Sequence, residues 1–282
     1  MRMPIKYVGE GIAFTRYSKY RYNPKLLCDP FISSTQFSDA ISLLRFGRTF
    51  KTTHSNRFPH SVTSVYRIIN GSPTSVLDIG ASDGSTSLEI IRKLNVSKYY
   101  ITDLNLIVKT REYKNFTFFL SEEGNLLCGI TENWMLFSTP LPITLQQRLV
   151  NGYLMYKFEQ SEASNQNVES TITLINPELK VLIGQKIKVL KYDGLEKWHG
   201  DRVNLVIIAN LLNDSYFDEK KKSIFLRNAL DSLEDNGLLL LAENRDNLEY
   251  SSIFRKATNR FVLLENLNGG VKSETLVFTI RS

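Results

Sequence analysis

Apolar residues recur at i, i+3, i+4 and i+7 in two parts of the chain, and this spacing is typical of helices that bury one face. It predicts one helix over residues 34–45 and another around 226–233, the latter ending at Asn236-Gly237. A shorter helical pattern over 62–69 stops at Asn70-Gly71. The polar stretches between these segments are where we expect the chain to turn.

Short β-branched and apolar runs predict strands, in chain order over 76–79, 99–102, 186–191, 203–209 and 238–242, with a helix over 85–94 after the first. Strands that alternate with helices favour a mostly parallel sheet covered on both faces. Two more runs, 261–264 and 275–280, flank Asn268-Gly269-Gly270 and predict a closing antiparallel hairpin. The expected fold class is therefore α/β, with a Rossmann-like, doubly wound, seven-stranded sheet.

About 80 residues separate the second predicted strand from the third, where a crossover needs only a dozen or two. We therefore expect an N-terminal basic and helical segment over 1–70, a main domain over 71–282, and a large insert over 106–184 within that domain. In the insert the pattern predicts a hairpin turning at 122–125, an extended stretch, a helix and a polar loop over 159–170. Its aromatic residues are expected to form a small core or to line a pocket: Phe116, Phe118, Phe119, Trp134 and Phe137.

Positive charge is concentrated at the start of the chain. Residues 1–60 hold ten Lys or Arg residues against three acidic ones, although the net charge of the whole chain is only +6. Tyrosines are interleaved with these cations, so the segment suits a nucleic-acid surface, a solvated basic arm, or a contact with an anionic substrate or acidic partner. The interleaved residues are Tyr7, Tyr17, Tyr20 and Tyr22.

The remaining composition predicts a cytoplasmic protein without a membrane segment. The first residues lack the apolar run of a secretory signal, and the least charged window, 124–147, is interrupted by polar residues and prolines. Cys28 and Cys128 are expected to be free thiols. With two cysteines and three histidines, no metal site is expected.

The stretch "SVLDIGASDGSTSLEIIRKL" predicts a sharp turn from strand to helix between Gly80 and Gly84. A phosphate-binding loop would need Lys after its last glycine, and here Ser85-Thr86 follows. The dinucleotide fingerprint would need glycine where Ser82 stands. The acidic residues Asp78 and Asp83 in and before the turn favour a ligand with a positive end.

At this point "VLDIGASDGSTS" resembles motif I of the class I S-adenosylmethionine-dependent methyltransferases. The resemblance extends over about 75–104 and 185–282, through "YYITDLN", "YDG", "VNLVIIANLLN" and "DNGLLLLAEN". It implies S-adenosyl-L-methionine as cofactor. It also implies a set of cofactor-binding residues: Asp78, Gly80, Ala81, Ser82, Gly84, Asp103, Leu104, Asp193, Gly194 and Asn210.

The family pattern also assigns roles to these residues. The glycine turn would pass along the methionine part of the cofactor, Asp103 would accept both ribose hydroxyls, and Asp193 would meet the adenine amine. Asp78 would orient the turn and the cofactor's amino group, while Asp83 would cap the helix. The alternatives are a helix cap or surface acid at Asp103 and an ordinary turn at Asp193.

The methyl acceptor is less well defined by the sequence. The segment 209–214 after the fourth strand lacks the prolines of the amino-methylating nucleic-acid enzymes. The following passage is weakly similar to the chemotaxis receptor carboxyl-methyltransferases, but Ala209 stands where that family has arginine. Candidate acceptor contacts are Asn213, Tyr216 and Arg57. Candidate catalytic bases are His54 and His60, with Tyr192, Tyr216 and Glu243 as weaker candidates.

The resemblance thus predicts an enzyme that transfers a methyl group from S-adenosylmethionine to an oxygen or nitrogen of a small or medium-sized acceptor. An anionic acceptor would suit the positive charge balance. The alternatives are a cofactor-binding or regulatory protein without catalysis, and an RNA or protein methyltransferase. The insert would be a lid, an acceptor-binding subdomain or an oligomer contact.

Overall fold

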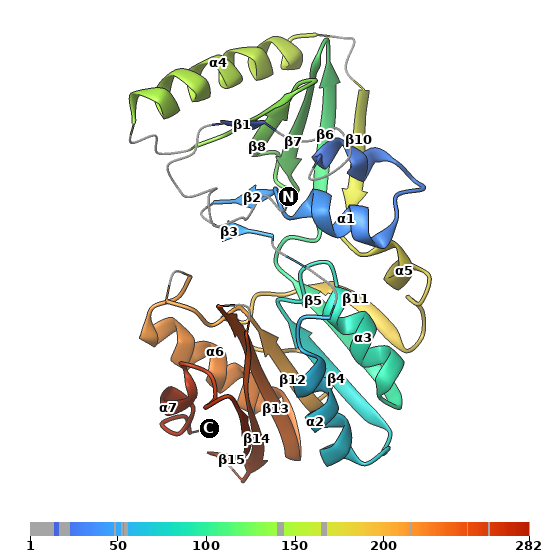
Figure 1. Cartoon of the computed structure of the whole chain (residues 1–282), viewed down its shortest axis with the longest axis vertical. Coiled ribbons are helices and arrows are strands. Elements are labelled where there is room, and N and C mark those ends of the chain that lie inside the picture. Colours follow the sequence, from blue (N-terminus) through green and yellow to red (C-terminus); the bar gives the residue numbers. More distant parts are fainter. Residues whose placement is uncertain are drawn as a thin grey trace. The chain divides into compact units, whose positions relative to one another are not determined.

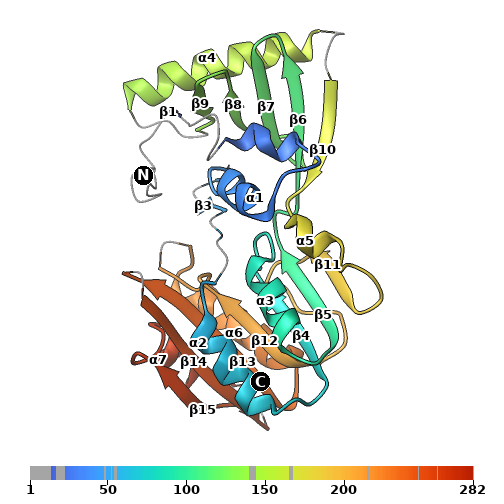
Figure 2. The same cartoon turned by 45° about the vertical axis from the view of Figure 1, so that its right-hand side comes forward.

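The computed structural model describes residues 14–16, 23–47, 49–51, 53, 56–139, 144–164, 168–214, 216–246, 248–258 and 260–281. The chain divides into two compact units (Figures 1 and 2). Unit 1 comprises residues 1–53 and 105–177, and unit 2 comprises 54–104 and 178–282. The predicted N-terminal segment is thus divided, because its first part belongs with the insert and its last helix belongs with the main domain.

Unit 2 is built on a seven-stranded sheet of order β11-β5-β4-β12-β13-β14-β15. The first four neighbouring pairs are parallel and the last two are antiparallel. The strands are β4 (Thr74–Ile79), β5 (Val96–Asp103), β11 (Ile187–Lys191), β12 (Val203–Ala209), β13 (Leu233–Arg245), β14 (Leu248–Ala257) and β15 (Arg260–Leu267). The α/β class with a mostly parallel sheet is therefore confirmed.

Helices cover both faces of this sheet. On one face α6 (Glu219–Ser232) and the short α7 (Glu274–Val277) pack on apolar strand residues such as Leu77, Val206 and Leu239. On the other face lie α2 (Pro59–Ile69) and α3 (Ser85–Lys93), which contact each other (Figure 2). The nearly uninterrupted apolar sequence of β12 follows from this double cover, since both of its faces are buried.

Two predictions at the end of unit 2 are wrong. The helix was expected to run to Asn236-Gly237, but α6 ends at Ser232 and this pair lies inside β13. Asn236 adopts the left-handed conformation (φ 64°), and the pairing of β13 with β12 shifts register there, so the pair makes a strand irregularity. The closing hairpin is formed by β14 and β15, whereas 275–280 contributes helix α7.

Unit 1 contains a six-stranded antiparallel sheet of order β1-β9-β8-β7-β6-β10 and a two-stranded ladder of β2 with β3. The strands are β1 (Phe14–Arg16), β2 (Arg45–Phe46), β3 (Thr49–Phe50), β6 (Ile107–Tyr113), β7 (Phe116–Ser121), β8 (Leu126–Ile130), β9 (Trp134–Phe137) and β10 (Val168–Thr173). The helices are the 3-10 helix η2 (Pro24–Cys28), α1 (Ser34–Ile41) and α4 (Leu145–Glu162), and α5 (Pro177–Lys180) follows at the boundary with unit 2. The predicted hairpin at 122–125 is confirmed as β7 and β8, whereas the polar loop expected over 159–170 is in part the end of α4 and the start of β10.

The aromatic residues of the insert form core on both faces of this sheet. Phe116 and Phe118 pack under Leu154 and Phe158 of α4, whereas Phe119 belongs to the cluster that includes α1. This division follows from the alternation of side chains along β7. Trp134 is the exception, since 43% of its surface is exposed. Packing therefore accounts for most of these residues, and the role of the insert as lid or acceptor-binding subdomain stays a prediction.

The basic N-terminal residues are only partly described. Tyr7, Tyr17, Tyr20 and Tyr22 lie outside the described residues, as do many of the cations. Two cations that are described have structural partners: Arg45 donates to the Ser138 carbonyl oxygen at 2.7 Å, and Lys51 donates to that of Asn105 at 2.5 Å. Both cations are buried, so they are not part of a solvated basic surface.

Candidate functional site

The strand order of unit 2 reverses between β4 and β12. From β4 the chain moves outward to β5 and then β11, and from β12 it moves the other way to β13. In doubly wound sheets a crevice opens outside the carboxyl ends of the strands at this reversal, because the two following connections leave on opposite faces. In unit 2 the two strand ends at that point are Ile79, which leads into Gly80, and Ala209, which leads into Asn210.

The turn after β4 depends on residues with positive φ. Gly80, Ser82 and Gly84 have φ angles of 72°, 60° and 79°, a region that residues with a side chain rarely adopt. A Cβ on Gly80 would lie 2.6 Å from a methyl carbon of Leu211, and one on Gly84 would lie 2.2 Å from a methyl carbon of Leu179. Both glycines are therefore favoured by their backbone conformation, and each lies directly against a leucine side chain.

Asp103 joins the end of β5 to this turn. Its Oδ2 atom accepts a hydrogen bond of 2.8 Å from the backbone N–H of Ser82. The hydroxyl oxygen of Ser82 is buried and has no hydrogen-bond partner among the described residues. Leu104, the next residue after Asp103, is half exposed. The predicted residues Ser82, Asp103 and Leu104 thus lie together at the sheet edge, with a carboxylate held by the turn.

Asp78 is buried below the turn rather than exposed in it. Its Oδ2 atom accepts hydrogen bonds from the hydroxyls of Ser87, at 2.6 Å, and Tyr99, at 2.9 Å. Burial raises the pKa of Asp78 to about 6, and the two hydroxyls partly oppose this rise. Through Ser87 this carboxylate links β4 to α3, which orients the turn between them.

Asp83 supports the first turn of α3. Its two carboxylate oxygens accept from the backbone N–H and the hydroxyl of Ser85, each at 2.9 Å. The side chain is fully buried. The first bond satisfies the Ser85 N–H, one of the groups that a helix start leaves without intrahelical partners, although the N-cap position itself is Gly84.

Residues 56–58 bring a cation to the same edge. The Asn56 N–H donates to Glu89 of α3, and the Arg57 carbonyl oxygen accepts from the Asn244 side chain at 3.1 Å. Burial lowers the pKa of Arg57, and the charges of Asp83 and Tyr216 oppose that effect. The printed contacts of Arg57 are with Asn244 at the end of β13, since its Nε atom also donates to the Asn244 side chain at 3.4 Å.

Asn210 follows the end of β12, the other strand at the switch point. It has a φ of 55°, its Oδ1 atom accepts from the Asn244 N–H at 2.8 Å, and its Nδ2 atom donates to the Asn244 side chain at 3.1 Å. The carbonyl oxygen of Asn213 accepts from the N–H groups of Tyr216 and Phe217, both at 3.1 Å. These bonds hold the segment after β12 in one conformation.

Asp193 and Gly194 follow β11 as a turn. The Asp193 Oδ1 atom accepts from the Leu195 N–H at 2.9 Å, which is the geometry of an aspartate that stabilises its own turn. A Cβ on Gly194 would lie 2.1 Å from the ring of Phe225 in α6. The structure thus accounts for both residues locally, and their predicted contact with adenine stays a prediction.

The predicted histidines receive little support. His54 lies outside the described residues. His60 is exposed in the first turn of α2, where its backbone N–H donates to Glu249 at 3.2 Å. Glu249 also accepts from the backbone N–H of Ser61 at 2.6 Å and from its hydroxyl, so it replaces the missing side-chain cap of α2. Glu249 and Asn244 were not predicted, because their partners are distant in sequence.

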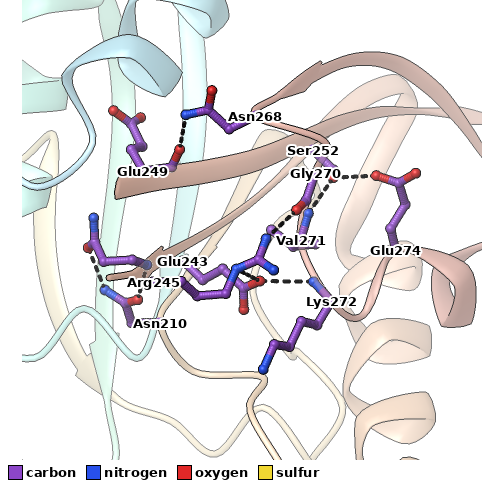
Figure 3. A network of polar contacts seen from close by, with 11 residues as sticks. Asn210, Glu243, Arg245, Glu249, Ser252, Asn268, Gly270, Val271, Lys272 and Glu274 are labelled. Atoms are coloured by element: carbon purple, nitrogen blue, oxygen red, sulfur yellow. Dashed lines mark hydrogen bonds and ion pairs between the residues drawn. The ribbon is translucent and has the colours of Figure 1, made fainter. Parts of the chain in front are cut away.

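A polar network extends from Asn210 along β13 to the segment before α7 (Figure 3). Arg245 lies with its Nε atom 3.1 Å from Glu243 Oε1, and its Nη2 atom donates to the Gly270 carbonyl oxygen at 2.7 Å. Glu243 Oε1 also accepts from the Lys272 N–H at 2.9 Å. Glu243 therefore fixes the 270–272 segment to the end of β13, rather than acting as an unattached base.

A pocket of about 320 Å³ adjoins this network within unit 2. It is lined by the segment after β12, the end of β13, and residues 271–273, together with Lys222 of α6. Asn210 and Asn213 belong to its wall, whereas Arg57, Tyr216 and Asp103 do not. The pocket therefore adjoins the segment after β12, and no residue of the glycine turn lines it.

None of the helices of the described residues is long and apolar enough to cross a bilayer. In the same part of the chain, no His, Cys, Asp and Glu side chains gather in threes or more as a metal ion would require. Cys28 is exposed, Cys128 is buried, and both are free thiols.

Comparison with known families and with curated proteins finds no match. Many solved structures match. The N-methyltransferase NodS from Bradyrhizobium japonicum WM9, in complex with S-adenosyl-L-homocysteine, is 10% identical with a TM-score of 0.35, covering 76% of this chain and 75% of that one. An O-methyltransferase family protein from Burkholderia thailandensis is 12% identical with a TM-score of 0.33, covering 64% and 36%.

The pyocyanin biosynthetic protein PhzM is 10% identical with a TM-score of 0.35, covering 64% of this chain. This chain spans 35% of the length of PhzM, about a third. The similarity to the chemotaxis receptor enzymes has no counterpart in these matches. At such identities and TM-scores we draw no conclusion from the likeness, and the function is inferred from the residues of this chain.

Proposed function

We propose that this chain is an S-adenosylmethionine-dependent methyltransferase of the class I type, acting on an oxygen or nitrogen of a small or medium-sized acceptor. The observation that carries the proposal is the bond between Asp103 and the Ser82 N–H, which holds a carboxylate at the switch point beside a glycine turn. A carboxylate there suits the two hydroxyls of a ribose, because it accepts two O–H donors at once.

The other residues of the crevice fit the same cofactor. The unpartnered, buried Ser82 hydroxyl is a polar atom that a ligand could satisfy. Arg57 lies near Asp83 at the start of α3, where a cation and a helix N-terminus together favour a carboxylate such as that of the methionine moiety. The buried Asp78 contributes by orienting the turn through Ser87.

When bound, S-adenosylmethionine supplies a methyl group on a positively charged sulfur. The protein must then align the acceptor with that group and exclude water. Within the crevice the segment 210–214, fixed by Asn210 and Asn244, is suited to align the acceptor. Of the two predicted histidines, the structure describes only His60, whose side chain is exposed in the first turn of α2. The proposal therefore includes no side-chain base.

Isothermal titration calorimetry of the full chain with S-adenosylmethionine and S-adenosylhomocysteine tests the proposal. We expect both to bind, and Asp103→Ala to weaken binding about 30-fold or more, because charge-assisted hydrogen bonds contribute about 1.5–3 kcal/mol each. Asp103→Asn keeps an oxygen for the Ser82 N–H and should lose less. Exposed Asp235→Ala is the matched control in the same unit. Absence of binding by the unmodified chain would contradict the proposal.

A further inference from the structure

The pocket beside β13 is lined by residues of two kinds. We call its apolar lining residues the floor: Ile208, Leu211, Leu212, Leu241 and Val271. We call its charged lining residues the rim, which comprises three cations and two carboxylates: Lys222, Arg245, Lys272, Asp214 and Glu243. Such a combination, with apolar walls and a few charged groups, is typical of a small-molecule site.

The charges of the rim are not matched one to one. Lys222, whose side chain is 8% exposed, pairs with Asp214, and Arg245 pairs with Glu243. The Lys272 ammonium has no hydrogen-bond partner among the residues that the structure describes. The hydrogen bond and charge of Lys222 lower the pKa of Asp214, and the charge of Lys272 adds to this effect. The rim thus carries one positive charge more than its carboxylates neutralise.

Arg245 is held in place independently of any ligand. Its guanidinium lies 3.6 Å from the centroid of the Tyr250 ring and donates to the Gly270 carbonyl oxygen. These contacts hold the planar Arg245 guanidinium in one orientation. The side chain would therefore lose little conformational entropy on binding a carboxylate. Figure 3 shows the Lys272 backbone N–H beside the Glu243 carboxylate, while the Lys272 side chain extends away from it. Arg245 at the end of β13 and Lys272 in the segment before α7 both line the pocket.

The pocket and the glycine turn share one wall. Leu211 lines the pocket, and its methyl carbon covers Gly80 at the distance where a Cβ would collide. Asn210, at the end of β12, lines the pocket as well. A ligand in the pocket would therefore lie beside the proposed cofactor turn, separated from it by the side chains that follow β12.

We infer that this pocket binds the carboxylate of the methyl acceptor, with Lys272 as its main specificity-determining residue. The inference rests on the proposed function for the identity of the ligand as acceptor. A monoanion would balance the single excess positive charge, whereas a phosphate dianion would leave a negative charge next to Asp214 and Glu243. A carboxylate on a compact apolar body fits both the rim and the floor.

Ligand-observed NMR with the full chain, saturated with S-adenosylhomocysteine, tests this inference with three probes. Benzoate carries one negative charge, benzyl alcohol is its neutral analogue, and phenyl phosphate carries up to two charges. We expect benzoate to bind about tenfold more tightly than benzyl alcohol, since one charge-assisted contact contributes about that factor. Phenyl phosphate is expected to bind more weakly than benzoate.

Variants locate the effect. Lys272→Gln should reduce benzoate binding about tenfold, to the level of benzyl alcohol, and Lys272→Arg should retain it. Lys221→Gln makes the same charge change on α6 outside the pocket and should leave binding unchanged. Equal binding of benzoate and benzyl alcohol, tighter binding of phenyl phosphate, or no response to Lys272→Gln would overturn the inference.

The same samples separate this inference from the proposed function. If S-adenosylhomocysteine binds in calorimetry but benzoate binds no more tightly than benzyl alcohol, the carboxylate pocket is wrong and the methyltransferase proposal stands. If benzoate binds through Lys272 but neither S-adenosylmethionine nor S-adenosylhomocysteine binds, the pocket is supported and its role in methyl transfer is overturned.

Discussion

The two sheets of this chain use their polar residues differently. In the parallel part of the unit 2 sheet, strands β4, β5 and β12 all end at one edge, and the glycine turn, Asp103 and Asn210 lie at these three strand ends. In the antiparallel sheet of unit 1, neighbouring strands end at opposite edges, and the strand β7 is buried along its whole length. Parallel pairing thus places the polar residues that follow several strands at one edge of the sheet. Antiparallel pairing places them at both edges, and the unit 1 sheet with its two covered faces is mainly a hydrophobic core.

The chain offers a way to test the two units separately, because it has two tryptophans, Trp134 in unit 1 and Trp198 in unit 2. Variants that keep one tryptophan each, Trp134→Phe or Trp198→Phe, report the unfolding of one unit by fluorescence. If the units unfold independently, a substitution in one sheet shifts only the transition of its own reporter.

The largest effect is expected for Phe118→Ala in unit 1. Phe118 is fully buried between the rings of Phe116, at 5.3 Å between centroids, and Phe158, at 5.5 Å. Truncating a buried Phe costs about 3–5 kcal/mol of unfolding free energy. Urea unfolding followed by Trp134 should show this loss, with Trp198 unaffected. Val168→Ala on the exposed edge strand β10 is the control, expected within about 0.5 kcal/mol.

An intermediate effect is expected from the buried carboxylate of unit 2. The pKa of Asp78 is raised to about 6 in the folded chain, above its value in the unfolded chain, so the folded chain binds this proton more tightly. The protonated Asp78 therefore contributes to the free energy of unfolding below about pH 4, and this contribution is lost as the pH rises through about 6. Asp78→Asn should remove that loss of about 2–3 kcal/mol and keep an acceptor for Ser87 and Tyr99.

The measurement is the difference in unfolding free energy, followed by Trp198, between the unmodified chain and Asp78→Asn from pH 4 to pH 7. Asp235→Asn, an exposed change of the same kind, should give a difference that does not vary with pH. A pH-independent difference for Asp78→Asn as well would show that the burial of its carboxylate is not the cause.

The smallest effect on stability is expected for Gly→Ala changes at two glycines of unit 2. Gly71 and Gly84 have φ angles of 75° and 79°, but a Cβ on Gly71 meets nothing within 4 Å whereas one on Gly84 meets Leu179. The left-handed backbone alone should make both Gly→Ala changes cost about 1–2 kcal/mol of unfolding free energy. Gly84→Ala should carry a small further cost from the contact with Leu179, and only this variant should weaken S-adenosylhomocysteine binding in calorimetry. Equal behaviour of the two variants would show that the turn has no special role.

The elements that the sequence predicted correctly are those determined by local chemistry. The turn from β4 into α3 was predicted because its glycines and the following helical pattern are adjacent in sequence, and Asn70 does end α2 with a left-handed conformation. Asn236-Gly237 has the same local chemistry but occurs within β13, where pairing with β12 absorbs it. The same dipeptide signal therefore predicts a helix end in one place and fails in another, because long-range pairing decides.

The candidate site was predicted only where neighbours in sequence are neighbours in space. Asp103 was expected at the end of β5 from its strand, and its bond to Ser82 follows from the pairing of β5 with β4. The bonds of Asn244 to Asn210 and Arg57 link residues 34 and 187 positions apart, which no local pattern encodes. Likewise, the rim of the pocket draws its cations from α6, β13 and the segment before α7.

The order in which these segments leave the ribosome also matters for folding. β1, at residues 14–16, pairs with β9, at residues 134–137, so the first strand waits for more than a hundred residues to be synthesised. At about 5–20 residues per second this interval is on the order of ten seconds. During that time β4 and β5 can already pair, with the glycine turn between them, before β12 arrives to complete the switch point. The glycine turn between β4 and α3 is therefore synthesised before the sheet to which it belongs is complete.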